Sequence, residues 1–301
     1  MDFEIKNGVL EHYNGNTPDV IIPSNVKEIG EKAFKDNKFL KSVIITRNVT
    51  VIGESAFEDC KNLEKIEIPK SVTKIGEFAF LQCDSLRKIV IPESVTTIDD
   101  FAFDSCYNLN EIVIPKSVTT IGDGAFDVTK WLENKMATEK NVVIVNDIVI
   151  SRANNIEESV NLEGVKEILT GVFLNCNEIK EFIVSDGTKI GYNAFFTGNT
   201  FNICLKHDDF SVNIPVKESE MEDYFFNTRT QNLFDFIGAG IEQKEYLFDE
   251  LEIPAYRYPL ALFMANVYES KFFRTFVDVH FKKIQKYAKN KAPYLLEFIS
   301  R

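Results

Sequence analysis

One aromatic residue recurs at a fixed interval, and this interval constrains the fold more than any other feature of the chain. Each copy closes the same phrase, which reads Ile-Gly-Glu-Phe-Ala-Phe in residues 75–80. Five copies stand 23 residues apart, at Phe34, Phe57, Phe80, Phe103 and Phe126. The phrase returns less perfectly 47 and 22 residues further on, at Phe173 and Phe195. A fixed period of this length indicates a solenoid of stacked units that is interrupted by an insertion.

A single unit, residues 63–83, shows how the period becomes structure. Ile66 and Ile68 alternate with charged residues, and this period of two is typical of a half-buried strand. Pro69 follows directly and ends the strand, because proline lacks the backbone donor that a sheet requires. The apolar positions after it turn the chain inward along the return path: Val72, Ile75, Ala79, Phe80 and Cys83. Stacked copies would bury these positions and pair successive strands in a parallel sheet, about 4.8 Å apart.

The unit has three recurrent parts: Ile-Pro at its opening, Val-Thr-x-Ile-Gly in its middle and Ala-Phe-x-x-Cys-x-x-Leu at its close. Together they resemble the BspA-like leucine-rich repeat family, whose repeat is of the Treponema pallidum type. The resemblance covers about residues 1–205, and Thr46, Glu163, Ser185 and Asn37 depart from its proline or cysteine positions. It implies a right-handed α/β-type solenoid with a parallel sheet, used in bacteria for cell adhesion or protein recognition. It implies no catalytic residues.

Two domains are expected. Residues 1–215 are predicted to form the repeat array, with hairpin-type units near 1–20 and 142–160 because each of these segments contains a turn dipeptide between short apolar runs. The polar stretch 133–140 is expected to be a protruding loop, and Trp131 beside it is expected to pack over an open edge of the solenoid. Residues 216–301 are predicted to form a small all-α C-terminal domain of four to six short helices, starting near Lys217.

One helix of this tail is expected to be buried over most of its surface, because its apolar residues occupy a broad stripe: Phe272, Phe273, Phe276, Val277, Val279, Ile284 and Tyr287. Five lysines follow on the same segment, and we interpret them as a solvated face near a helix end rather than as an anion site: Lys282, Lys283, Lys286, Lys289 and Lys291.

Composition and sequence termini limit the classes of function. The chain has 301 residues and a formal net charge of −12, which argues against nucleic acid as a partner. No bilayer-spanning segment is present, and the first residues carry no signal-peptide pattern. We therefore expect a cytoplasmic protein, or a secreted or cell-surface one if a signal was removed from this numbering.

No enzyme signature stands out, so the sequence predicts a protein that is not an enzyme and has no cofactor. The histidines His12, His207 and His280 lie in unrelated contexts and have no metal spacing. Cys60, Cys83 and Cys106 share one repeat position, with Cys176 continuing the column, and the 23-residue spacing favours buried packing residues over a zinc site. Cys204 has no counterpart in the repeats.

Two surfaces follow from the repeat. Strand alternation sends one column to the open face of the sheet: Ile21, Ile44, Glu67, Val90 and Val113, with Ile183 later. A second column flanks it: Asp19, Ser42, Lys65, Lys88 and Glu111. The other surface is an acidic ridge after the glycine position, which we interpret as capping the start of a helical turn rather than as a calcium site: Glu31, Glu54, Glu77, Asp100 and Asp123.

The open face predicts the function. We expect a non-enzymatic binding or adhesion scaffold that recognises a protein or an extended polymer along its sheet face. The same apolar column would also allow two copies of the chain to associate. β-Branched residues alone would give the same column without a partner, because they favour strands in general. A rival hypothesis assigns an enzymatic or nucleic-acid-binding activity to the helical domain and makes the repeats a targeting module.

Overall fold

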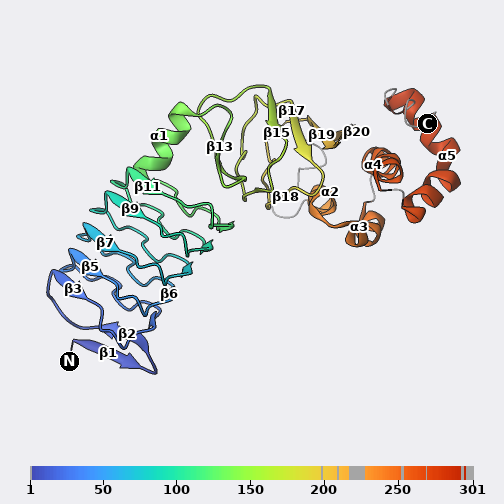
Figure 1. Cartoon of the computed structure of the whole chain (residues 1–301). Helices are drawn as coiled ribbons and strands as arrows, with labels where there is room; N and C mark the ends of the chain where they lie inside the picture. Colours follow the sequence, from blue (N-terminus) through green and yellow to red (C-terminus); the bar gives the residue numbers. More distant parts are fainter. Residues whose placement is uncertain are drawn as a thin grey trace. The chain divides into compact units, whose positions relative to one another are not determined.

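The computed structural model describes residues 2–197, 199–208, 210–216, 228–251, 254–268, 270–292 and 295. These residues form two compact units (Figure 1). The first unit comprises Met1–Asn146 and Ala153–Asn155, and the second comprises Asp147–Arg152 and Ile156–Arg301. Lys217, where the helical patterning is predicted to begin, lies outside the described residues. The boundary at residue 216 therefore stays a prediction.

The first unit opens with the expected hairpin. Strands β1 (Phe3–Lys6) and β2 (Val9–Tyr13) pair antiparallel. Asn7 and Gly8 connect them with φ angles of 53° and 84°, the left-handed backbone that a tight two-residue turn requires. Glycine and asparagine tolerate this conformation best, which is why the dipeptide was informative.

Each repeat then contributes one strand to each of two parallel columns. The first column contains β3 (Asp19–Ile21), β5 (Ser42–Ile44), β7 (Lys65–Glu67), β9 (Lys88–Val90) and β11 (Glu111–Val113). The second column continues from β2 through β4 (Glu28–Ile29), β6 (Val51–Ile52), β8 (Lys74–Ile75), β10 (Thr97–Ile98) and β12 (Thr120–Ile121). Equivalent residues stand opposite one another, as Val43 does to Val20 and Ile66, and all three are buried. Figure 1 shows the short strands of the first column stacked in sequence order.

The recurrent phenylalanines form one continuous buried stack. Phe57, Phe80 and Phe103 are fully buried, and the ring centroids of Phe80 lie 5.2 Å from those of Phe57 and 5.1 Å from those of Phe103. These rings are within 5° of parallel, a stacked arrangement that adds to the burial of apolar area. Tyr13 covers the stack before Phe34, with ring centroids 5.0 Å apart. The predicted core column is therefore present.

A short helix ends the stack. Trp131 packs on Phe126 with ring centroids 5.2 Å apart, in agreement with its predicted position over an edge. The polar stretch 133–140 was expected to be a loop, and this expectation is wrong for most of it, because residues Lys130–Thr138 form helix α1. The Thr129 side chain caps this helix by accepting a hydrogen bond of 3.1 Å from the Leu132 amide. Strand β13 (Val142–Val145) follows in the same unit.

The second unit continues the repeat pattern in two columns. One contains β14 (Ile148–Arg152), β16 (Glu167–Ile168) and β18 (Lys189–Ile190). The other contains β15 (Ser159–Leu162), β17 (Glu181–Ser185), β19 (Phe201–His207) and β20 (Phe210–Val216). The last pair is antiparallel, so β20 ends the parallel array. Phe173 and Phe195 are fully buried, so the predicted phenylalanine position is a core position in this unit as well.

Helices complete the second unit: α2 (Thr228–Gly238), α3 (Ile241–Leu247), the 3₁₀ helix η2 (Phe248–Glu250), α4 (Pro254–Val267) and α5 (Lys271–Lys291). Helix α2 packs on β18 and α4 packs on β20. Helix α5 buries Phe273, Ile284 and Ala288 on one side, but Val279 and Phe281 are exposed. The prediction that most of this helix is buried is therefore wrong, because neighbours cover only one of its faces.

Candidate partner-binding face

Four apolar side chains of the first unit stand out from the sheet into solvent. Their exposed fractions are 64% for Ile21, 42% for Ile44, 52% for Val90 and 46% for Val113, although the residue before each of them is buried. Their strands are aligned so that Ile21 is opposite Ile44 and Val90 is opposite Val113. We call the column formed by Ile21, Ile44, Glu67, Val90 and Val113 the stripe. The structure thus places these predicted residues on one face, and their role in binding stays a proposal.

Charged side chains border the stripe on the side where the strands begin. Lys65 Nζ lies 2.7 Å from Glu67 Oε1, and the Lys88 ammonium forms an ion pair with Glu111. All four side chains are exposed, so each pair contributes little to stability. These pairs do neutralise this border, and Lys65 compensates the single charge that interrupts the apolar stripe.

Ile183 does not join the stripe. It lies on β17 of the second unit and is only half-buried, with Asn161 and Cys204 as its partners on the neighbouring strands. The structure therefore brings together the predicted residues of the first unit and leaves Ile183 in another unit.

A hollow of about 950 Å³ lies over the last three strands of the column. Its base includes Val90 and Val113 together with the prolines that end their strands, Pro92 and Pro115. Lysines rise on both sides of it: Lys65 and Lys88 where the strands begin, and Lys70 and Lys116 beyond the prolines. A concave apolar surface with a few polar groups at its edge is the usual form of a binding site. The prolines were predicted only to end strands, and their contribution to the base was missed.

The acidic ridge has a different local structure from the one predicted. Its residues precede tight turns instead of helical turns, because the next residue has a left-handed φ in all five repeats, for example 58° at Lys32 and 55° at Phe78. The Asp100 carboxylate accepts a hydrogen bond of 2.8 Å from the Asp123 amide of the next repeat. This carboxylate therefore links neighbouring repeats. In the described part of the chain, no group of three or more His, Cys, Asp or Glu side chains is arranged to hold a metal ion.

The cysteine column is part of the core. Cys60, Cys83 and Cys106 are fully buried free thiols. Each thiol donates to the carbonyl of a phenylalanine 26 residues earlier, with Sγ–O distances of 3.1, 3.2 and 3.0 Å. Burial raises the pKa of Cys60 to about 12, and burial also raises the pKa of Cys83 well above its usual value. Cys60 and Cys83 therefore stay protonated and poorly nucleophilic at neutral pH.

We expect these three thiols to react slowly with iodoacetamide in the native protein at pH 8 and rapidly in urea. The reason is that alkylation requires an accessible thiolate: burial removes the access for all three thiols, and at Cys60 and Cys83 it also suppresses the charge. Labelling over time, followed by peptide mass spectrometry, measures each rate. Cys204 is the internal control, because it is only half-buried.

Equal labelling rates for Cys83 and Cys204 in the native protein would contradict this expectation.

The stability of the fold should also depend on pH through Cys60. Since folding raises the pKa of Cys60 from 9.0 to about 12, its contribution to stability is complete below about pH 9. It should be lost as the pH rises towards 12, and Cys60→Ala should show a weaker loss over this range.

The second unit contains a buried ion pair that sequence reasoning missed. Lys244 and Asp186 have side-chain exposures of 1% and 0%, and Lys244 Nζ lies 3.1 Å from Asp186 Oδ1. The ammonium also donates to the Ile237 carbonyl at 2.8 Å, and the Tyr268 hydroxyl donates to the Asp186 carboxylate. Burial lowers the pKa of Lys244 and raises that of Tyr268. This network ties α3 and α4 to the chain after β17.

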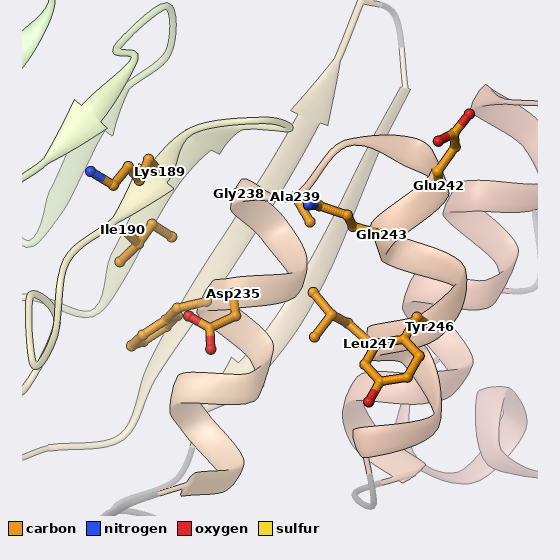
Figure 2. A pocket seen from close by; sticks show the side chains of 10 residues that line it. Lys189, Ile190, Asp235, Gly238, Ala239, Glu242, Gln243, Tyr246 and Leu247 are labelled. Atoms are coloured by element: carbon orange, nitrogen blue, oxygen red, sulfur yellow. The ribbon is translucent and has the colours of Figure 1, made fainter.

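A second hollow, of about 590 Å³, lies between β18 and helices α2 and α3. Figure 2 shows Lys189 and Ile190 on one side of it and Tyr246 and Leu247 on the other. Lys189 is already paired with Glu167, and Asp235 accepts from Gln231 at 2.8 Å. Lys189 and Asp235 at its edge are thus engaged in local contacts, and the hollow offers mainly apolar packing.

The remaining candidates lie apart from one another. Lys282, Lys283, Lys286 and Lys289 are exposed on α5, and Lys291 is the last residue of that helix. His280 Nδ1 lies 3.0 Å from the Phe276 carbonyl one turn earlier, whereas His12 is on β2 and His207 is on β19. Among the described residues, no helix is both long and apolar enough to cross a membrane.

Comparison with known proteins identifies the repeat. The family model named BspA type leucine-rich repeat region matches this chain in six copies, over residues 4–133 and 85–202. The T. pallidum leucine-rich repeat protein is 28% identical over 63% of this chain and 81% of its own, with a TM-score of 0.44. A leucine-rich repeat protein from Bacteroides ovatus is 25% identical, over 65% of this chain and 58% of its own, with a TM-score of 0.43. The pneumococcal vaccine antigen PcpA is 27% identical, over 62% and 50%, with a TM-score of 0.43. A search of curated proteins gives no significant match.

Proposed function

This chain belongs to the BspA-type leucine-rich repeat family, and from that premise we propose that it is a binding scaffold whose stripe contacts a protein or an extended polymer. Proteins built from such repeats are generally binding scaffolds, because stacked units present a long continuous surface. The observation that carries the proposal is the exposure of Ile21, Ile44, Val90 and Val113 in one aligned column. Soluble proteins rarely expose contiguous apolar surface without a use.

The shape of the surface around the stripe also supports the proposal. The hollow over Val90 and Val113 gives a partner a concave apolar base, and the lysines around it provide a polar border. Adhesion at a bacterial surface is one form that such binding would take, and the partner itself is identified by the test below.

The test is a pull-down from the source cell with the parent chain and with Val90→Glu/Val113→Glu. Both side chains project into solvent, so the double variant should keep the melting temperature of the parent. A partner seated on the stripe would bury two uncompensated carboxylates, and its affinity should fall at least tenfold. Lys130→Glu, on the exposed surface of α1, is the matched control, because it adds a carboxylate away from the stripe.

The proposal fails if the double variant retains full affinity for the captured partner and keeps the oligomeric state of the parent. Dissociation of a dimer by the same substitutions would instead show that a second copy occupies the stripe. If the proposal fails, the partner binds another surface, and the exposed lysines of α5 would be the next surface to test.

A further inference from the structure

We propose that the partner segment seated on the stripe is a single amphipathic α-helix of about 13 residues, acidic along one edge. This inference rests on the proposed function, because it takes the stripe to be the binding surface. It adds the conformation and the charge of the partner segment, which follow from the spacing, width and charge of the face.

Spacing along the column favours a helix over an extended chain. The stripe runs over five strands: β3, β5 and β7 pair in one sheet and β9 pairs with β11 in the next. Paired strands lie about 4.8 Å apart, so the stripe spans at least about 19 Å. Same-face residues of a helix recur about every 5.4 Å, so four turns drift by only about 2 to 3 Å from the strands. Same-face residues of an extended chain recur about every 6.7 Å, and four intervals drift by about 8 Å. Only the helix keeps one side chain opposite each strand.

The width of the face also suits a helix. Pro92 is four residue steps along the chain from Lys88, a span of about 13 Å at the rise of a strand. A helix with its side chains is about 10 to 12 Å across. Lys65 and Lys88 stand on one side of the hollow, and Lys70 and Lys116 stand on the other. A helix lying along the column would therefore rest on the valines and prolines between two rows of lysines.

Charge distinguishes the two borders. The row that begins each strand is neutralised internally, since Lys65 pairs with Glu67 and Lys88 pairs with Glu111. The row beyond the prolines contains Arg47, Lys70 and Lys116, and no carboxylate of the described chain lies within 4 Å of any of them. Glu93 is the one acidic residue in that row. The unpaired cations would attract a partner helix whose facing edge carries carboxylates.

Glu67 sets a further requirement on the partner. It replaces an apolar residue at the middle of the stripe, and Lys65 already holds its carboxylate at 2.7 Å. The turn of the helix that lies over β7 should therefore present a small or polar residue, while the turns over β3, β5, β9 and β11 should present apolar ones.

Synthetic peptides and the full chain test the inference. The probes are three 16-residue peptides: one with leucines at helical spacing and glutamates along one edge, an isomer of the same composition with leucines at every second position, and a helical peptide with lysines in place of the glutamates. Fluorescence anisotropy would measure their affinities for the parent chain, for Val90→Glu/Val113→Glu and for Lys70→Glu/Lys116→Glu.

We expect the acidic helical peptide to bind the parent at least tenfold tighter than either of the other peptides. Its affinity should fall at least tenfold in each double variant. Lys70→Glu/Lys116→Glu should instead bind the lysine peptide more tightly than the acidic one. Salt should weaken both the preference of the parent for the acidic peptide and the preference of this variant for the lysine peptide. Lys130→Glu, on the exposed surface of α1, is the control charge reversal.

Several results would overturn the inference: no binding of the acidic helical peptide, equal binding of its isomer, or no effect of Lys70→Glu/Lys116→Glu. The proposed function has a separate criterion. If Val90→Glu/Val113→Glu abolishes capture of the cellular partner while the peptides show no helical preference, the stripe stands as the binding surface and the helix does not. If Val90→Glu/Val113→Glu changes neither the capture of the cellular partner nor the binding of the peptides, both proposals fail.

Discussion

Phe80→Ala should lower the free energy of unfolding by about 3 to 5 kcal/mol. The side chain is fully buried, and its ring stacks between Phe57 at 5.2 Å and Phe103 at 5.1 Å. Its removal leaves a cavity between two neighbouring repeats. Hydrogen bonds hold the backbones of these repeats, so the cavity cannot collapse freely. The Phe80 amide, for example, donates to the Ala102 carbonyl at 2.8 Å. Thermal and urea unfolding would measure the loss, which should lower the melting temperature by on the order of 10 °C.

Phe39→Ala is the matched control, because Phe39 belongs to the same repeat array but is 58% exposed. It should change the free energy of unfolding by less than about 0.5 kcal/mol. If Phe80→Ala melted within a degree or two of the parent, the phenylalanine stack would not be the core of the array.

Lys244→Met should destabilise the second unit by about 3 to 5 kcal/mol, because it leaves the Asp186 carboxylate buried without its cation. The Tyr268 hydroxyl would be the remaining donor to that carboxylate among the contacts described above. Hydrogen exchange of amides in α2 and α3 would report the loss directly, since this region depends on the network.

Gln243→Met is the control for this substitution. It introduces the same side chain on the same helix at an exposed position. The double variant Lys244→Met/Asp186→Leu should recover part of the lost stability, because it removes both charges together. Equal stability of Lys244→Met and Gln243→Met would show that the ion pair contributes nothing to holding α3 in place.

The repeat array was predictable because its determinants are local and recur. Alternation around Ile66, the proline after most of the strands and the 23-residue spacing together predicted the strands, the phenylalanine stack and the exposed column. The Asn7-Gly8 turn was predictable for the same reason, since the dipeptide itself favours the left-handed backbone.

Other features depend on contacts that no local pattern records. The two-residue strands of the second column, such as β8, are too short to show any alternation. Left-handed turns occur at Phe78 and Phe101, where no glycine marks them. Lys244 lies between Gln243 and Glu245 and resembles a surface residue in sequence, yet tertiary contacts bury it. The residues of α1 lack an apolar stripe, so only the Thr129 cap and the packing of Trp131 indicate that helix.

Hydrogen exchange on the complex with the captured partner tests the central claim most directly. Amides that the partner covers exchange more slowly in the complex than in the free chain. The positions of these amides show which surface binds the partner. We predict that protection on binding concentrates in residues 19–23, 42–46, 65–69, 88–92 and 111–115, which carry the strands β3 to β11 and the residues that follow them. Protection confined to the helices beyond residue 228, with these strands unchanged, would contradict the claim and assign binding to the helical part of the chain.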